Sequence, residues 1–273
     1  MTVEPAPAPA LLALEPPLRL AAFAVVFVLM ALWERRAPRR PLAIGRRRRW
    51  PGNLGIAVLD TLLLRLLLPT AAFGTALLGE ARAWGLLPAL GVSGWPAVVT
   101  AVVVLDLAIY LQHVLFHALP LLWRLHRMHH ADLDVDVTTG NRFHPIEILL
   151  SMLWKIAVVV ALGAPAAAVL LFEVLLNATA LFGHGNVRLA GPLDRALRWL
   201  LVTPDMHRVH HSAVPAETGS NFGFNLSCWD RLLGTYRAAP AAGHERMTIG
   251  LEAFRDPGEL RLDRMLSQPF RTR

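Results

Sequence analysis

Long apolar segments alternate with short polar ones along this chain of 273 residues. Three apolar stretches cover residues 18–33, 53–78 and 97–119, and a longer one covers residues 148–182, with Gly163-Ala164-Pro165 near its middle. Because a helix needs about 20 apolar residues to cross a bilayer core, the first three stretches predict three membrane spans. Glycine and proline interrupt the fourth, which predicts a hairpin of two short helices. The pattern therefore predicts an all-α, integral-membrane helical bundle of about three spans plus this hairpin.

The polar segments divide the chain into four regions. Residues 1–16 are rich in alanine and proline and are expected to form a disordered N-terminal tail. Residues 17–96 hold the N-terminal membrane helices and an arginine-rich loop, residues 97–236 contain most of the histidines, and residues 237–273 are expected to form a C-terminal tail. From His184 onward the chain is more polar, which predicts a cap outside the bilayer.

The positive charge of the chain is concentrated near its first predicted span. The formal net charge is +7, and eight arginines lie between Arg35 and Arg49. Such a cluster between membrane helices is typical of the cytoplasmic side, and it can contact anionic lipid headgroups. Flanking apolar spans argue against a nucleic-acid partner. If the first span ends inside, the third span and the hairpin both return there, so the histidine-rich cap is expected on the cytoplasmic side of the membrane.

The histidines carry the candidate chemistry. A single cysteine, Cys228, excludes a disulfide within the chain and a thiolate-rich metal site. Eight of the eleven histidines fall in three clusters: His113 and His117; His126, His129 and His130; His207, His210 and His211. Residues three and four apart share a helix face, so each cluster can direct its imidazoles at one centre. Imidazole binds iron, zinc, copper and nickel. Eight ligands exceed the needs of one four-coordinate ion, which predicts two metal ions.

Four further residues are candidates for the site. His184 follows the predicted hairpin and is expected to be a ninth ligand, whereas His144 is a ligand, a partner of a ligand or an anchor of its loop. Asp106 and Tyr110 precede His113 on one stripe of the third span and are candidate catalytic residues. Asp106 is expected either to orient a ligand histidine or to form a salt bridge to another helix, for example with Arg65. Tyr110 is expected either to pack against its neighbours or to take part in the reaction.

Taken in order, these motifs resemble the fatty acid hydroxylase/sterol desaturase superfamily. The matching strings are HxxxH at His113, HxxHH at His126 and HxxHH at His207, in the order and spacing of that superfamily from about residue 97 to residue 236. Supporting strings are Arg142-Phe143-His144-Pro145, His184-Gly185-Asn186, Thr203-Pro204-Asp205-Met206-His207 and Trp229-Asp230-Arg231-Leu232-Leu233-Gly234-Thr235-Tyr236.

The resemblance implies a membrane helical bundle under a histidine-rich cytosolic cap, with residues 97–236 as the catalytic domain. It implies two non-haem iron ions that use O2 to hydroxylate or desaturate a lipid, such as a sterol, a fatty acyl chain or an alkylglycerol, as in monooxygenases of lipid biosynthesis. No cytochrome b5-like or ferredoxin-like segment is visible, so a separate ferredoxin-, cytochrome b5- or reductase-like protein is expected to supply electrons.

Two other classes of protein compete with the oxygenase. A membrane zinc hydrolase would activate water on its metal, but it usually needs a general base and an open coordination position. No HExxH motif occurs, and eight histidines exceed what that site needs. A metal transporter or store would carry polar ligands near the bilayer midplane, and the few charged residues within the predicted spans outline no path.

Overall fold

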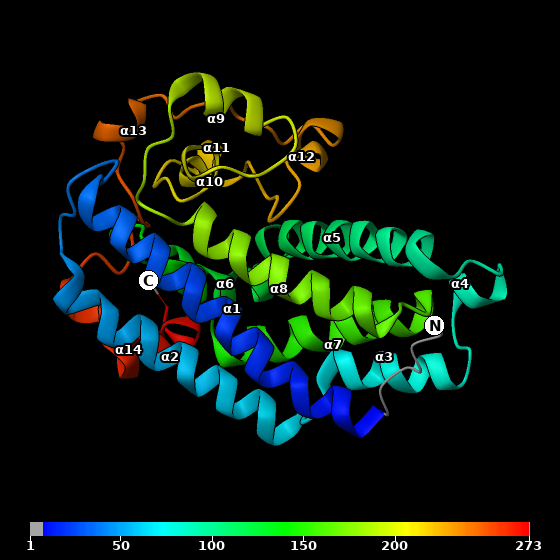
Figure 1. Cartoon of the computed structure of the whole chain (residues 1–273). Coiled ribbons are helices and arrows are strands. Elements are labelled where there is room, and N and C mark those ends of the chain that lie inside the picture. The colour runs from blue at the N-terminus through cyan, green and yellow to red at the C-terminus, as the bar shows by residue number, and fades with distance from the viewer. Residues whose placement is uncertain (1–7, 273) are drawn as a thin grey trace.

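The computed structural model describes residues 8–272. Within that range it consists of helices and loops, and its β-structure is limited to three isolated β-bridges. Five long helices lie side by side (Figure 1): α1 (Ala8–Arg36), α2 (Arg46–Leu67), α5 (Gly94–Ala118), α7 (Pro145–Leu162) and α8 (Ala166–Gly183). Each of the five candidate membrane spans among the described residues covers all or most of one of these helices. The prediction of an all-α membrane bundle is confirmed.

The N-terminal helices differ from the predicted ones at their ends. Helix α1 begins at Ala8, so residues 8–16, expected in the disordered tail, are helical, whereas residues 1–7 of that tail lie outside the described residues. The stretch 53–78, expected as one span, forms two helices, because α2 ends before Pro69 and α3 (Ala71–Ala81) follows it. Proline removes a helical hydrogen bond and restricts the residue before it, which accounts for this break.

The predicted hairpin is formed by α7 and α8. Gly163 ends α7 with φ 67°, and its N–H donates to the carbonyl of Val159. A Cβ at this position would lie 2.0 Å from the carbonyl oxygen of Trp84, so only glycine allows the turn to pack against the segment before α4 (Leu86–Ala89). This contact fixes the end of the bundle that lies far from the histidines.

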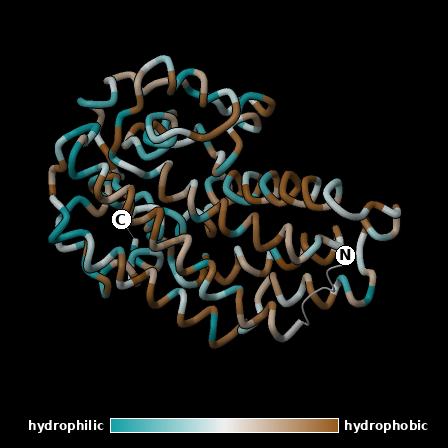
Figure 2. The backbone as a smooth tube through the Cα atoms, viewed as in Figure 1, coloured by the Kyte–Doolittle hydropathy of each residue, from teal (hydrophilic) through white to brown (hydrophobic). Residues whose placement is uncertain are grey.

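Apolar side chains face both the interior and the outside of the bundle. Leu105, Val169 and Phe172 are buried where α5 and α8 pack together, whereas Leu62 and Leu66 on α2 are exposed. Figure 2 shows hydrophobic residues along the length of these helices, with more polar residues toward the end that carries the cap. An apolar outer surface on apolar helices is the pattern that lipid contact requires.

Figure 1 shows short helices grouped in a cap over one end of the bundle: α9 (Gly191–Leu197), α10 (Pro204–His210), α11 (Pro215–Thr218), α12 (Cys228–Leu232) and α13 (Gly243–Arg246). Beneath them, α6 (Pro120–His130) packs against α5 and is followed by η1 (Thr139–Asn141). The expected C-terminal tail is folded as far as residue 272. It contains η2 (Pro257–Leu260), α14 (Leu262–Ser267) and η3 (Gln268–Phe270), and it buries Leu260 and Met265 beside α2. The two apolar side chains are the physical reason for this packing.

One arginine of the predicted surface loop is an interior residue. Arg49 is fully buried, and its guanidinium makes two hydrogen bonds of 2.7 Å to Asp132 and one of 2.6 Å to Asp136. Because Asp132 and Asp136 follow α6, this ion pair joins the start of α2 to the loop that leaves the histidine-bearing helix. Charge patterning along the sequence did not distinguish Arg49 from its exposed neighbours.

Candidate metal centre

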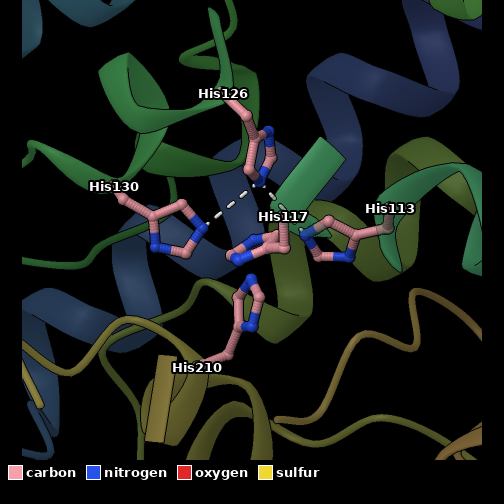
Figure 3. A group of neighbouring side chains, drawn as sticks. All are labelled: His113, His117, His126, His130 and His210. Carbon is pink, nitrogen blue, oxygen red and sulfur yellow. Dashed lines mark hydrogen bonds between the residues drawn. The ribbon is translucent and has the colours of Figure 1, made fainter. Parts of the chain in front are cut away.

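Nine histidines from four parts of the chain converge beneath the cap. Helix α5 supplies two, α6 supplies three, the C-cap of α8 is His184, and α10 with its C-cap supplies three. They form two groups within which the possible ligand atoms all lie within 4.8 Å of one another: His113, His117, His126, His130 and His210 in the first, and His129, His184, His207 and His211 in the second. Figure 3 shows the first group. The structure thus brings together all nine residues proposed as ligands.

Burial favours the neutral form of the converging histidines. Burial lowers the pKa of His126 to about 3 and that of His184 to about 4. Burial, followed by the charges of neighbouring imidazoles, also lowers the pKa of His129 and His211 well below the ordinary value. A neutral imidazole keeps one nitrogen lone pair free, and that lone pair is what a metal ion requires.

Backbone carbonyls fix which nitrogen carries the proton. The Nδ1 atom of His113 lies 2.7 Å from the carbonyl oxygen of Phe222, and that of His210 lies 2.7 Å from the carbonyl oxygen of Ser220. His184 is held in the same way by Ala180 at 2.7 Å. A carbonyl only accepts hydrogen bonds, so each Nδ1 must be the donor and each Nε2 must keep its lone pair.

These lone pairs face one another at short distances. The Nε2 atoms of His113 and His126 are 3.1 Å apart in the first group. In the second group the Nε2 atom of His184 lies 3.2 Å from that of His129, whose Nδ1 atom is 3.1 Å from the carbonyl oxygen of Arg142. Two lone pairs at this distance repel unless a cation lies between them. The donor set therefore fits two metal ions, one in each group.

Glu147 is a site residue that the sequence analysis missed. Its Oε1 atom lies 2.6 Å from Nδ1 of His126, and the second oxygen is buried without a hydrogen-bond partner in the described chain. A carboxylate in this position fixes the tautomer of the histidine and strengthens it as a ligand. The sequence did contain a signal for Glu147. It is an acidic residue two positions after the Arg142-Phe143-His144-Pro145 string, in the first turn of the helix that begins at Pro145. Phe143, from the same string, stacks on His129.

His144 lies outside both groups and serves as a helix cap. Its Nδ1 atom accepts a hydrogen bond of 3.2 Å from the backbone N–H of Ile146, and Nε2 lies 3.3 Å from the carbonyl oxygen of Leu266. Of the three roles considered for it, the geometry matches an anchor that starts α7 and places Glu147 at the metal centre.

Asp106 and Tyr110 support a loop rather than a histidine ring. Asp106 accepts hydrogen bonds from the backbone N–H of Leu226 at 3.2 Å and from Trp229 at 2.8 Å. Neither expected partner is used: Arg65 pairs instead with Glu15, 3.5 Å away.

The Tyr110 hydroxyl lies 2.8 Å from the Thr235 hydroxyl, which donates to Asp230. Asp230 in turn accepts from the backbone N–H groups of Phe222 and Gly223. Tyr110 thus helps to hold the loop whose Phe222 carbonyl orients His113.

A cavity of about 700 Å³ adjoins the first group of histidines. His113 and His126 line it at one end, and apolar side chains such as Phe116 continue its wall between α1, α2, α5, α7 and α8. Leu20 on α1 and Leu62 on α2 also line the cavity, and both are largely exposed on the outside of the bundle. The cavity therefore extends from the metal centre to the lipid-facing surface.

Comparison with known proteins finds sequence similarity to a hydroxylase family and to two named lipid enzymes. The family model described as fatty acid hydroxylase matches residues 98–235. Ornithine lipid hydroxylase OlsE of Rhizobium tropici is 37% identical over 150 residues, which cover 54% of this chain and 44% of that protein. Alkylglycerol monooxygenase of Xenopus tropicalis is 31% identical over 136 residues, covering 48% of this chain and 28% of that protein. The matched region thus spans less than half the length of either relative. No solved structure matches the chain significantly.

Proposed function

Since the chain belongs to the fatty acid hydroxylase family, we propose that it is a membrane-bound di-iron oxygenase that hydroxylates or desaturates a lipid with O2 and external electrons. The family membership confirms the resemblance found in the sequence. Relatives named as a lipid hydroxylase and as a lipid monooxygenase support a lipid substrate and O2-dependent chemistry. The match covers too little of those proteins to transfer a particular lipid.

The observation that carries this proposal is the continuity between the cavity and the first group of histidines. His113 and His126 belong to that group and also line the cavity. An apolar chain that entered between α1 and α2 would therefore end beside the metal ligands. A transporter needs no apolar cavity that ends at its metal ligands.

Iron fits the donor set and the chemistry. Nine neutral imidazoles supply nitrogen ligands for two ions, with five in one group and four in the other. When bound, iron would supply the redox activity that O2 chemistry needs and that zinc lacks. The carbonyls of Phe222 and Ser220 and the carboxylate of Glu147 would keep the rings oriented, and Phe116 would exclude water from the end of the cavity.

The side of the membrane and the electron donor are part of the proposal. Arg39, from the arginine-rich segment, bonds Asp205 beside His207, so the arginines and the metal centre lie at the same end of the bundle. Because such arginines favour the cytoplasm, the centre would face the cytoplasm and receive electrons there from a separate donor protein.

The test is metal analysis combined with product analysis. The purified protein should hold about two irons per chain, the stoichiometry implied by two ligand groups. Membranes that contain it should convert a lipid to an alcohol or an alkene only with O2 and a reductant. His129→Ala should abolish this conversion while the protein remains inserted. Stoichiometric zinc, with an activity that does not depend on iron and releases a hydrolysed lipid, would instead establish a zinc hydrolase.

A further inference from the structure

An unpaired acidic side chain lines the cavity and belongs to neither group of histidines. Asp60 on α2 is only 7% exposed and belongs to the cavity wall. Its Oδ1 atom is buried with no hydrogen-bond partner, and no ion pair to it is formed within residues 8–272. An unpaired carboxylate at membrane depth is costly, so a partner that is bound only at times would account for it.

A second acidic group lies close to Asp60. Glu147 lines the same cavity from α7, is within electrostatic range of Asp60, and has one oxygen free of protein partners. The other oxygen holds His126. Two carboxyl groups near each other favour a positively charged group in the space they share.

Three basic side chains also line the cavity, and each of them pairs with an acid: Arg65 lies 3.5 Å from Glu15. Arg19 contacts Glu15 at 2.6 Å and Glu173 at 2.8 Å, and Lys155 contacts Glu173 at 2.8 Å. Lys155 and Glu147 are eight residues apart on α7, or roughly 12 Å along its axis at 1.5 Å per residue. A cation in the cavity would be repelled from this basic region and drawn toward the acidic region beside the metal centre.

We propose that Asp60 determines substrate specificity by binding the positively charged amine of a lipid headgroup, next to the carbon that is oxidised. The inference rests on the proposed function and adds a substrate class to it: a lipid whose ammonium group enters the cavity near Glu147. A metal ion is a poorer occupant, because Asp60 is absent from both groups of closely spaced ligand atoms found among the described residues. The ammonium would restore charge balance to the two carboxyl groups.

The experiment compares two single-chain lipids that differ only in their headgroup. Hexadecylamine is charged at pH 7 because alkyl ammonium groups titrate near pH 10, as lysine does, and hexadecanol is neutral. Binding of each to the purified protein is measured by native mass spectrometry for the wild type and for Asp60→Asn, which keeps the shape of the side chain. Asp263→Asn removes the same charge from an exposed surface position and serves as the matched control.

The wild type and Asp263→Asn should bind hexadecylamine at least about tenfold more tightly than hexadecanol, the scale of a charge-assisted hydrogen bond. Asp60→Asn should lose this preference and bind hexadecanol as before, which also shows that the variant is folded. An equal affinity of the wild type for both lipids, a preference that survives in Asp60→Asn, or a parallel loss of hexadecanol binding would overturn the inference. Oxidation of each lipid with iron, O2 and a reductant is followed separately. A preference in binding without any oxidation contradicts only the oxygenase, whereas equal binding and equal oxidation of both lipids contradict only the role of Asp60.

Discussion

The carboxylate of Glu147 holds His126 through a hydrogen bond of 2.6 Å to Nδ1, while Nε2 of the same ring faces His113 and His130. The two residues come from different helices, α7 and α6, and are 21 positions apart. The bond therefore connects the packing of the bundle to the geometry of the metal centre, and it makes the orientation of one ligand depend on where α7 begins.

Glu147→Ala should lower metal affinity or activity by about 10- to 100-fold, the usual effect of removing the partner of a metal-binding histidine. Glu147→Gln should lose less, because the amide oxygen still accepts from Nδ1. Iron content and product formation measure both effects. Glu252→Ala, at an exposed position, is the matched control. Equal losses in the Ala and Gln variants would show that the charge matters more than the orientation of the ring.

Arg49→Ala should destabilise the protein by about 3–5 kcal/mol, because it leaves Asp132 and Asp136 buried without their cation. Arg48→Ala removes an exposed neighbour and should change stability by less than about 0.5 kcal/mol. Thermal unfolding in detergent gives both values. Similar unfolding temperatures for the two variants would show that the buried pair contributes little to stability.

Removal of the metal should lower the unfolding temperature. Without cations, the Nε2 atoms of His129 and His184 remain 3.2 Å apart with their lone pairs facing each other, because both Nδ1 atoms are held by carbonyls. Bound metal stabilises the native state by mass action, by about 2.7 kcal/mol at a free concentration one hundred times Kd. Differential scanning fluorimetry of the protein after chelation and after iron is restored measures the shift. The proposal of two ions predicts that the unfolding temperature recovers fully only near two irons per chain, and saturation at one would contradict it.

The sequence predicts that the histidines converge, because the spacing within each cluster is a local property of one helix. The spacing of His126, His129 and His130 needs only a helix to place the rings on one face. The roles of Glu147, Asp60 and Arg49 could not be predicted from the sequence, because they depend on contacts with residues from other segments of the chain. The helical spacing correctly placed Asp106 on the same helix as His113 and His117. Its partners, however, come from the loop before α12 and from α12 itself, which the periodicity of α5 does not describe.

Tyr110→Phe should retain activity within about tenfold of the wild type, although the sequence marks Tyr110 as a candidate catalytic residue. Its hydroxyl contacts Thr235, and the chain of hydrogen bonds continues through Asp230 to the backbone of Phe222. Loss of one neutral hydrogen bond at the end of that chain costs about 1 kcal/mol.

Asp230→Ala should be more damaging, because it frees two buried N–H groups and with them the carbonyl that orients His113. Product formation, with iron content measured in parallel, distinguishes the two variants. Lower iron content in Asp230→Ala would show that the substitution acts through the ligand His113. A complete loss of activity in Tyr110→Phe at full iron content would instead place the tyrosine hydroxyl in the reaction itself, because a defect confined to the loop would reduce iron binding as well.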